Sequence, residues 1–159
     1  MQRINPICKL ICIALLALGS GTQPGAAQNA TSAKARDEQA IRSLIQQENE
    51  GKRVIKYTDE AIFVSGAYPR PAIGAKQVET MSREVSSKRS NESRSAETVR
   101  LVLSKSRDLA YEFGNFKLSF DDSDGKKVNL AGSYLRVWRK VDSEWKVDAF
   151  FARPNRDVQ

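Results

Sequence analysis

Two long runs of alternating residues in the C-terminal half restrict what this chain can fold into. Residues 108–121 and 126–140 each alternate between apolar and polar side chains, which is the period of a half-buried β-strand. They are separated by Asp122-Ser-Asp-Gly125, a sequence typical of a tight hairpin turn. The sequence therefore predicts an antiparallel hairpin of unusual length at the centre of the fold.

Shorter runs extend this hairpin into a sheet. Residues 97–104 alternate in the same way, and residues 145–153 follow a second tight turn at 141–144. With the long pair they predict a meander of four antiparallel strands. The short apolar run Ala61-Ile-Phe-Val64 predicts one more buried strand earlier in the chain.

Two amphipathic helices are expected before the meander. Residues 34–50 carry apolar side chains at helical spacing and are followed by Gly51, a common helix terminator. A second helix is predicted from near Gly74 to about Lys88, after a stiff Pro69-Arg-Pro71 loop. Residues 86–95 are mostly serine and charged side chains, which predicts a polar mobile linker.

The aromatic residues of the long strands suggest that the sheet curls. Tyr111 and Phe113 have one parity, whereas the apolar side chains after Gly114 have the other. A β-bulge at Gly114-Asn115 would return both sets to one face and bend the strand, and Gly132 would bend its partner. We therefore expect an α+β fold: a curved antiparallel sheet wrapped around the N-terminal helices to form a cone with an internal pocket.

The N-terminus has the pattern of an export signal. Arg3 and Lys9 precede the apolar run 10–18, and small residues follow up to Ala27, where we predict cleavage. The apolar run is too short to span a bilayer, for which about 20 residues are needed, so no stable membrane anchor is expected.

These boundaries divide the chain into four parts. We predict a cleaved signal peptide over 1–27, a flexible tail over 28–33, one domain over 34–153 and a C-terminal tail over 154–159. The expected location is periplasmic or extracellular. Both cysteines leave with the signal, and a short signal without cysteine in the mature chain favours a bacterial source.

The 159-residue chain contains no histidine, which excludes several kinds of chemistry. A Ser-His-Asp triad, a Cys-His pair and histidine metal ligands are impossible. The Asp-rich turn before Gly125 lacks the oxygen ligands that a calcium loop needs at its ends, so we expect no metal and no cofactor. The formal net charge is +7, but the basic residues are scattered among acidic ones, which argues against nucleic-acid binding.

Four stretches resemble a known superfamily. They are Asp37-Glu-Gln-Ala-Ile-Arg-Ser-Leu-Ile45, Tyr57-Thr-Asp-Glu-Ala-Ile-Phe-Val64, Gly132-Ser-Tyr-Leu-Arg-Val-Trp-Arg-Lys140 and Trp145-Lys-Val-Asp148. In this order they are similar to the nuclear transport factor 2-like superfamily, in its SnoaL-like and ketosteroid-isomerase-like branch. The resemblance covers residues 34–153 and implies the cone fold. It implies no single activity, because the superfamily includes isomerases, cyclases, dehydratases, binding modules and oligomerisation domains.

The positions that hold catalytic residues in this branch are occupied by other residue types in this chain. The resemblance places the general base of the ketosteroid isomerases at Ser65 and their oxyanion-hole tyrosine at Leu44. A serine cannot take a proton at neutral pH without an adjacent base. SnoaL-type cyclases use a histidine, which this chain lacks. The enzyme class is therefore uncertain, and the sequence favours a protein without catalysis.

Candidate ligand-binding residues are mainly aromatic. Tyr57, Tyr68 and Tyr111 are possible hydrogen-bond donors. Arg136 shares its parity with two aromatic neighbours: on a concave face it would suit an anionic ligand, and on the outer face it would pair with an acid or a dimer partner. The predicted ligand-binding set is Tyr57, Phe63, Tyr68, Met81, Tyr111, Phe113, Tyr134, Arg136 and Trp138.

Asp148 is the only carboxylate in the last strand, and it is either a catalytic acid or a salt-bridge partner. Two functional hypotheses follow. The first is an exported, noncatalytic module that binds a small apolar or amphipathic molecule, dimerises through its sheet, or does both. The second is a SnoaL-like enzyme with a new constellation. A homodimer is expected because Leu135 and Val137 give the sheet a second apolar face.

Overall fold

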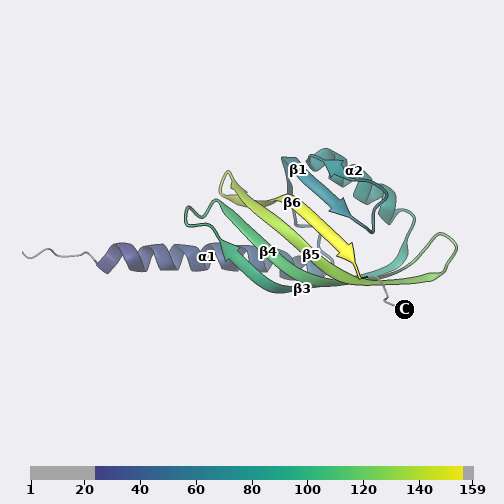
Figure 1. The fold of residues 1–159 in the computed structure, drawn as a ribbon, viewed down its shortest axis with the longest axis horizontal. Coiled ribbons are helices and arrows are strands. Elements are labelled where there is room, and N and C mark those ends of the chain that lie inside the picture. Colours follow the sequence, from purple (N-terminus) through teal and green to yellow (C-terminus); the bar gives the residue numbers. More distant parts are fainter. Residues whose placement is uncertain (1–23, 156–159) are drawn as a thin grey trace, which may run out of the picture.

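The structure is a computed structural model, which describes residues 24–155 (Figure 1). Its elements are α1 (Pro24–Asn49), β1 (Tyr57–Ser65), β2 (Ala72–Ile73), α2 (Ala75–Ser86), β3 (Ser90–Leu103), β4 (Leu109–Asp121), β5 (Lys127–Val141) and β6 (Glu144–Pro154). Most of the predicted signal peptide and the last four residues lie outside the described part. Helix α1 begins upstream of the predicted start at Lys34, so the segment expected to be a tail lies within this helix.

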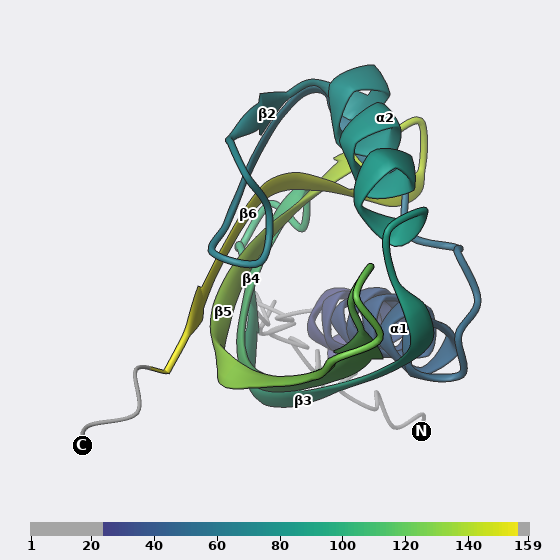
Figure 2. The ribbon, with the colours of Figure 1, turned by 90° about the vertical axis from the view of Figure 1, so that its right-hand side faces the viewer.

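The six strands form one curved sheet in the order β2-β1-β6-β5-β4-β3. Figure 2 shows the sheet curling from β2 round to β3, with α1 and α2 on its concave side. The predicted meander is present, and the fold is α+β as expected. The sheet is mixed rather than purely antiparallel, because β1 runs parallel to β6. This pairing joins segments about 90 residues apart in sequence, and local patterns carry no signal for it.

The predicted linker at 86–95 is wrong. Helix α2 ends at Ser86, and β3 begins at Ser90 and pairs with β4 along its length. This first half of β3 is solvent-exposed, so it lacks the apolar alternation by which strands are recognised. Pairing with the long neighbouring strand supplies the backbone hydrogen bonds that its own sequence does not predict.

The sheet bends at bulges that lie elsewhere than expected. Strand β4 pairs with β5 without interruption, so Gly114 is not in a bulge. Register shifts fall instead in β3, between Ser90 and Ser93 and at Val99 opposite Gly114, and at Asp148 in β6. The parity of β4 is therefore unbroken, and its even-numbered residues all face the concave side. As a correction, Tyr111 and Phe113 point to the convex side, where they are 39% and 42% exposed.

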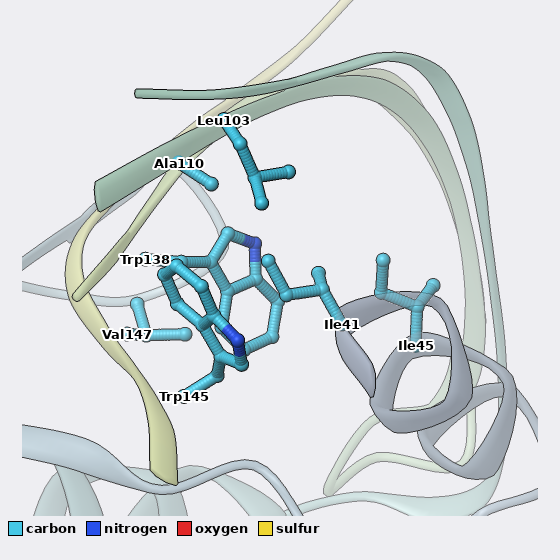
Figure 3. Close-up of a cluster of buried hydrophobic side chains, with 7 residues drawn as sticks. All are labelled: Ile41, Ile45, Leu103, Ala110, Trp138, Trp145 and Val147. Carbon is cyan, nitrogen blue, oxygen red and sulfur yellow. The ribbon is translucent and has the colours of Figure 1, made fainter. Parts of the chain in front are cut away.

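One core cluster fastens α1 to the sheet (Figure 3). Ile41, one turn before Ile45, points from the helix toward the two tryptophans Trp138 and Trp145. Asp37 on the same helix accepts hydrogen bonds from Lys140 Nζ (2.5 Å) and Trp145 Nε1 (3.4 Å). This packing fills one end of the concave side and leaves the other end for the site described below.

Candidate functional site

A cleft of about 1080 Å³ occupies the concave side between α2, the end of α1 and the sheet. Its walls come from nearly every element, and they combine aromatic rings with charged side chains. The lining residues that carry the argument below are Glu48, Tyr57, Phe63, Tyr68, Arg136 and Phe150. The space is large enough for a small organic molecule.

Aromatic rings form one continuous wall of the cleft. Phe63 stands at its centre, stacked on Phe150 with ring centroids 4.9 Å apart. Tyr57 and Tyr68 meet the edges of the same ring at 6.0 and 5.0 Å. Tyr134 continues the wall at 6.0 Å from Phe150. These contacts join β1, β5, β6 and the loop after β1. They leave Phe63 and Tyr134 only 4% and 3% exposed, so the ring surface open to a ligand comes from the partly exposed Tyr57, Tyr68 and Phe150.

Arg136 lies on the concave face at the inner end of this wall, and its side chain is only 6% exposed. Its Nη2 atom donates a hydrogen bond to Glu48 Oε2 at 2.9 Å, and Nη1 lies 3.6 Å from Glu112 Oε2. Burial alone would lower the pKa of Arg136, but the two carboxylates outweigh it and raise the pKa above its ordinary value. Nη1 makes no hydrogen bond within the described residues.

Glu112 is a fully buried carboxylate behind the cleft wall. It accepts hydrogen bonds from Thr98 Oγ1 (2.9 Å), from Trp138 Nε1 (3.0 Å) and from the Tyr134 hydroxyl. Arg136 supplies the compensating charge. A buried carboxylate is tolerated only when donors and a counter-charge surround it, and here both conditions are met.

The missing side chain of Gly114 makes room for this network. A Cβ atom at this position would lie 2.5 Å from the Tyr134 hydroxyl and 2.4 Å from the Glu97 carbonyl oxygen. Tyr134 therefore crosses over Gly114 to reach Glu112 on the adjacent strand. Gly114 is needed for this close approach, and not for the bulge that its sequence position suggested.

Two tyrosine hydroxyls in the cleft have no partner among the residues that the structure describes. Neither the Tyr57 nor the Tyr68 hydroxyl makes a hydrogen bond to any residue in the described range. Burial is the main cause that raises the pKa of Tyr57 above its ordinary value, and the charges of Arg136 and Glu48 also act on it. Tyr57 is therefore a neutral hydrogen-bond donor at physiological pH.

Two further arginines, Arg94 and Arg89, line the cleft. Arg94 Nη1 is 3.3 Å from Glu48 Oε1, so Glu48 is held by Arg94 on one oxygen and by Arg136 on the other. Arg89 lies over the Phe120 ring at 4.0 Å and donates a hydrogen bond from Nη2 to the Ala67 carbonyl at 2.8 Å. It thereby ties the loop after β1 to the start of β3.

The structure brings five of the nine predicted ligand-binding residues to the cleft: Tyr57, Phe63, Tyr68, Tyr134 and Arg136. Met81 and Trp138 face the same side but are buried in the core and do not line the cleft. Tyr111 and Phe113 lie on the opposite face. Arg136 combines parts of both expected alternatives, because it faces the concave side and pairs with acids.

Asp148 does not line the cleft. It accepts a hydrogen bond from Thr58 Oγ1 at 2.8 Å and pairs with Arg139 Nη2 at 2.7 Å. Burial alone would raise its pKa, but these two partners outweigh it and lower the pKa below 3.8. A carboxylate that stays ionised in an ion pair is not poised to donate a proton, so Asp148 is a salt-bridge partner.

Sequence reasoning missed Glu112 and Glu48. The supposed bulge placed Glu112 on the outer face, whereas the unbroken alternation of β4 would have placed this acid in the core. Of the positions implied by the resemblance, Ser65 lines the cleft and Leu44 packs against the core. The Ser65 hydroxyl accepts a hydrogen bond from the Ala67 amide at 3.3 Å and has no base beside it in the described part.

The described residues contain no group of three or more side chains arranged to hold a metal ion. No helix among them is long and apolar enough to cross a membrane. The arrangement of the cleft offers hydrogen-bond donors and ring surfaces, with its two innermost carboxylates already engaged by arginines.

Comparison of the sequence with known protein families and with curated proteins finds no match. Solved structures are similar in fold. One is hexachlorocyclohexane dehydrochlorinase LinA-type3 from Novosphingobium barchaimii, at 15% identity, 81% coverage of this chain, 91% of that chain and a TM-score of 0.61. A nuclear transport factor 2-like superfamily protein from Salmonella enterica has 11% identity, 84% and 96% coverage, and a TM-score of 0.56.

A ketosteroid isomerase-like protein from Erwinia carotovora is also similar, at 17% identity, 83% and 92% coverage, and a TM-score of 0.54. These matches extend over almost the whole length of each solved protein. They include a dehydrochlorinase and proteins named only by their fold family, so they transfer the architecture and no single chemistry. The chain has the nuclear transport factor 2-like fold, which it shares with these solved structures.

Proposed function

We propose that this protein is a noncatalytic module that binds a small amphipathic molecule in its concave cleft. The observation that carries the proposal is the cleft itself, with a wall of aromatic rings on one side and, beside it, donors that have no acceptor among the described residues. Such a surface holds the apolar body of a ligand and orients its polar end.

The absence of histidine from the sequence and the state of the acids favour binding over catalysis. Glu48 is held by two arginines, and Glu112 is sealed behind the wall by three donors. A general base needs a free lone pair within reach of the substrate. The alternative is a SnoaL-like enzyme with a non-standard constellation, which the enzymes among the structural neighbours favour.

A neutral fluorescent probe tests the proposal. N-phenyl-1-naphthylamine should bind with a rise in fluorescence, and Ala96→Trp should reduce its affinity at least about tenfold by filling the cleft. Ala96 lines the cleft, whereas Glu97 is exposed and has the opposite parity, so Glu97→Trp is the matched control. Equal binding to the wild type and to Ala96→Trp, with both folded by circular dichroism, would refute binding in the cleft.

The convex face supports a second role, dimerisation. Phe113 lies opposite Leu135, Leu135 opposite Phe151, and Phe151 opposite Val64, which makes an apolar row across four strands. Three of these side chains are at least 40% exposed. Soluble monomers seldom leave such a row in water, and two copies packed back to back would cover it with one self-complementary surface.

We also propose that the protein is exported. The basic and apolar pattern before Ala27 is the reason to expect a mature protein of 132 residues in the periplasm or the medium. Mass spectrometry of protein recovered there should find residues 1–27 missing. An intact Met1 in the recovered protein would refute cleavage.

A further inference from the structure

Three donors of the cleft have no hydrogen-bond acceptor among the described residues. Arg136 Nη1 is buried and makes no hydrogen bond in the described part of the protein. The hydroxyls of Tyr57 and Tyr68 are likewise without a partner there, and both residues line the cleft with Arg136. A buried guanidinium N–H without an acceptor is costly, so a ligand oxygen that accepts from it would be favoured.

These donors lie within electrostatic reach of one another. The pKa of Tyr57 responds to the charges of Arg136 and Arg94 and to Tyr68. Phe63 contacts both tyrosine rings, and the Arg136 guanidinium carbon lies 5.4 Å from the centroid of the Phe150 ring in the same wall. A ligand ring placed on this wall would therefore bring its polar end close to Arg136.

The side chains that line the cleft carry more positive than negative charge, which favours an anionic ligand. Its lining includes nine lysines and arginines but only four glutamates, among the residues the structure describes. Glu48 pairs with Arg94 and Arg136, and Arg136 is also the counter-charge of Glu112, so these innermost charges balance and the positive surplus comes from the other lysines and arginines of the lining. An incoming anion therefore meets a positive field, and its oxygens meet donors of fixed geometry.

We infer that the ligand is a carboxylate: a small molecule with a flat apolar body against the exposed part of Phe150, whose carboxylate accepts hydrogen bonds from Tyr57, Tyr68 and Arg136. A planar carboxylate matches the planar guanidinium, and the aromatic wall selects against small hydrophilic anions such as inorganic phosphate. This inference rests on the proposed function, and it names the chemical class that the cleft prefers.

Displacement of N-phenyl-1-naphthylamine by two matched compounds tests the inference. Naphthalene-2-carboxylate and naphthalene-2-carboxamide have the same ring and nearly the same shape, and at pH 7 only the first is charged. The carboxylate should displace the probe at a concentration at least about tenfold lower, the advantage of a charge-assisted over a neutral hydrogen bond. Equal potency of the two compounds would overturn the inference.

Removal of one tyrosine hydroxyl at a time tests which donors bind the carboxylate. Tyr57→Phe and Tyr68→Phe should each weaken the carboxylate by about fivefold or more and reduce its advantage over the amide. Tyr111→Phe is the matched control, because Tyr111 lies on the convex face, and it should change neither compound. An unchanged carboxylate-to-amide ratio in both cleft variants would refute the assigned donors.

The outcomes separate the two proposals. If N-phenyl-1-naphthylamine binds but the carboxylate has no advantage, the cleft binds ligands and the inferred class is wrong. If neither the probe nor the naphthalene compounds bind up to millimolar concentration, the proposed function fails together with the inference.

Discussion

At the residue scale, the paired charges of Glu112 and Arg136 stabilise the concave side of the sheet. Glu112→Gln should lower the free energy of unfolding by about 2–4 kcal/mol, because it removes the counter-charge of a buried arginine and turns an amide N–H₂ toward existing donors. Chemical denaturation monitored by tryptophan fluorescence measures this loss. Glu97→Gln, at an exposed position of β3, should stay within about 0.5 kcal/mol of the wild type. A similar small effect of Glu112→Gln would contradict the network.

The ion pair of Asp148 predicts how the stability of the fold depends on pH. Its pKa is lowered in the folded protein, so its ion pair with Arg139 stabilises the fold above the unfolded pKa, and that contribution is lost as the pH falls through the lower folded pKa. Asp148→Asn should cost about 0.5–1 kcal/mol at pH 7, a modest value because Arg139 is half exposed. The difference from the wild type should shrink as unfolding is measured from pH 5 down toward pH 2. A difference that persists at the lowest pH would refute the ion-pair account.

At the element scale, Gly114 shows how β4 and β5 fit together. Gly114→Ala should destabilise the protein by about 1–3 kcal/mol, because the new methyl group collides with the Tyr134 hydroxyl and the Glu97 carbonyl. Gly125→Asn is a suitable control: Gly125 has a positive φ of 74°, which asparagine tolerates, and a Cβ atom added there would meet no other atom within 4 Å in the described part of the protein. A denaturation midpoint that rises or stays unchanged in Gly114→Ala would contradict the described packing.

Elements defined by local signals could be predicted from the sequence, whereas those that depend on distant partners could not. The hairpin turn before Gly125 follows from its Asp and Gly residues, and α2 from its apolar stripe at Val78 and Met81. The exposed half of β3 and the parallel pairing of β1 with β6 are decided by neighbouring strands. A period-two pattern also leaves open which face is concave.

The candidate site shows the same division. Tyr57, Phe63 and Tyr68 were predictable as pocket residues because they surround a stiff loop and a buried strand. Glu112 was not, because a parity change at Gly114 suggested a bulge that the structure places in β3 instead. A glycine beneath a crossing tyrosine has the same sequence signature as a glycine in a bulge, and only the cross-strand register distinguishes them.

At the scale of the whole molecule, the curved sheet has two faces with different expected roles. Leu135 is 40% exposed in the middle of the convex apolar row, so Leu135→Lys should be tolerated in a folded monomer. We expect the wild type to have twice the mass of one chain by light scattering, and Leu135→Lys to halve that mass without a loss of circular dichroism. Val147→Lys, at a buried position of the same sheet, should instead unfold the domain. A monomeric wild type at high micromolar concentration would contradict the proposed dimer.

The concave face carries the central claim, that the cleft on the aromatic wall binds an amphipathic carboxylate. A crystal structure of the protein grown with naphthalene-2-carboxylate tests this most directly. The account predicts the naphthalene ring against Phe150, with carboxylate oxygens within hydrogen-bond distance of the Tyr57 hydroxyl and Arg136. A cleft filled by the protein's own side chains, or a ligand bound only on the convex row, would contradict it.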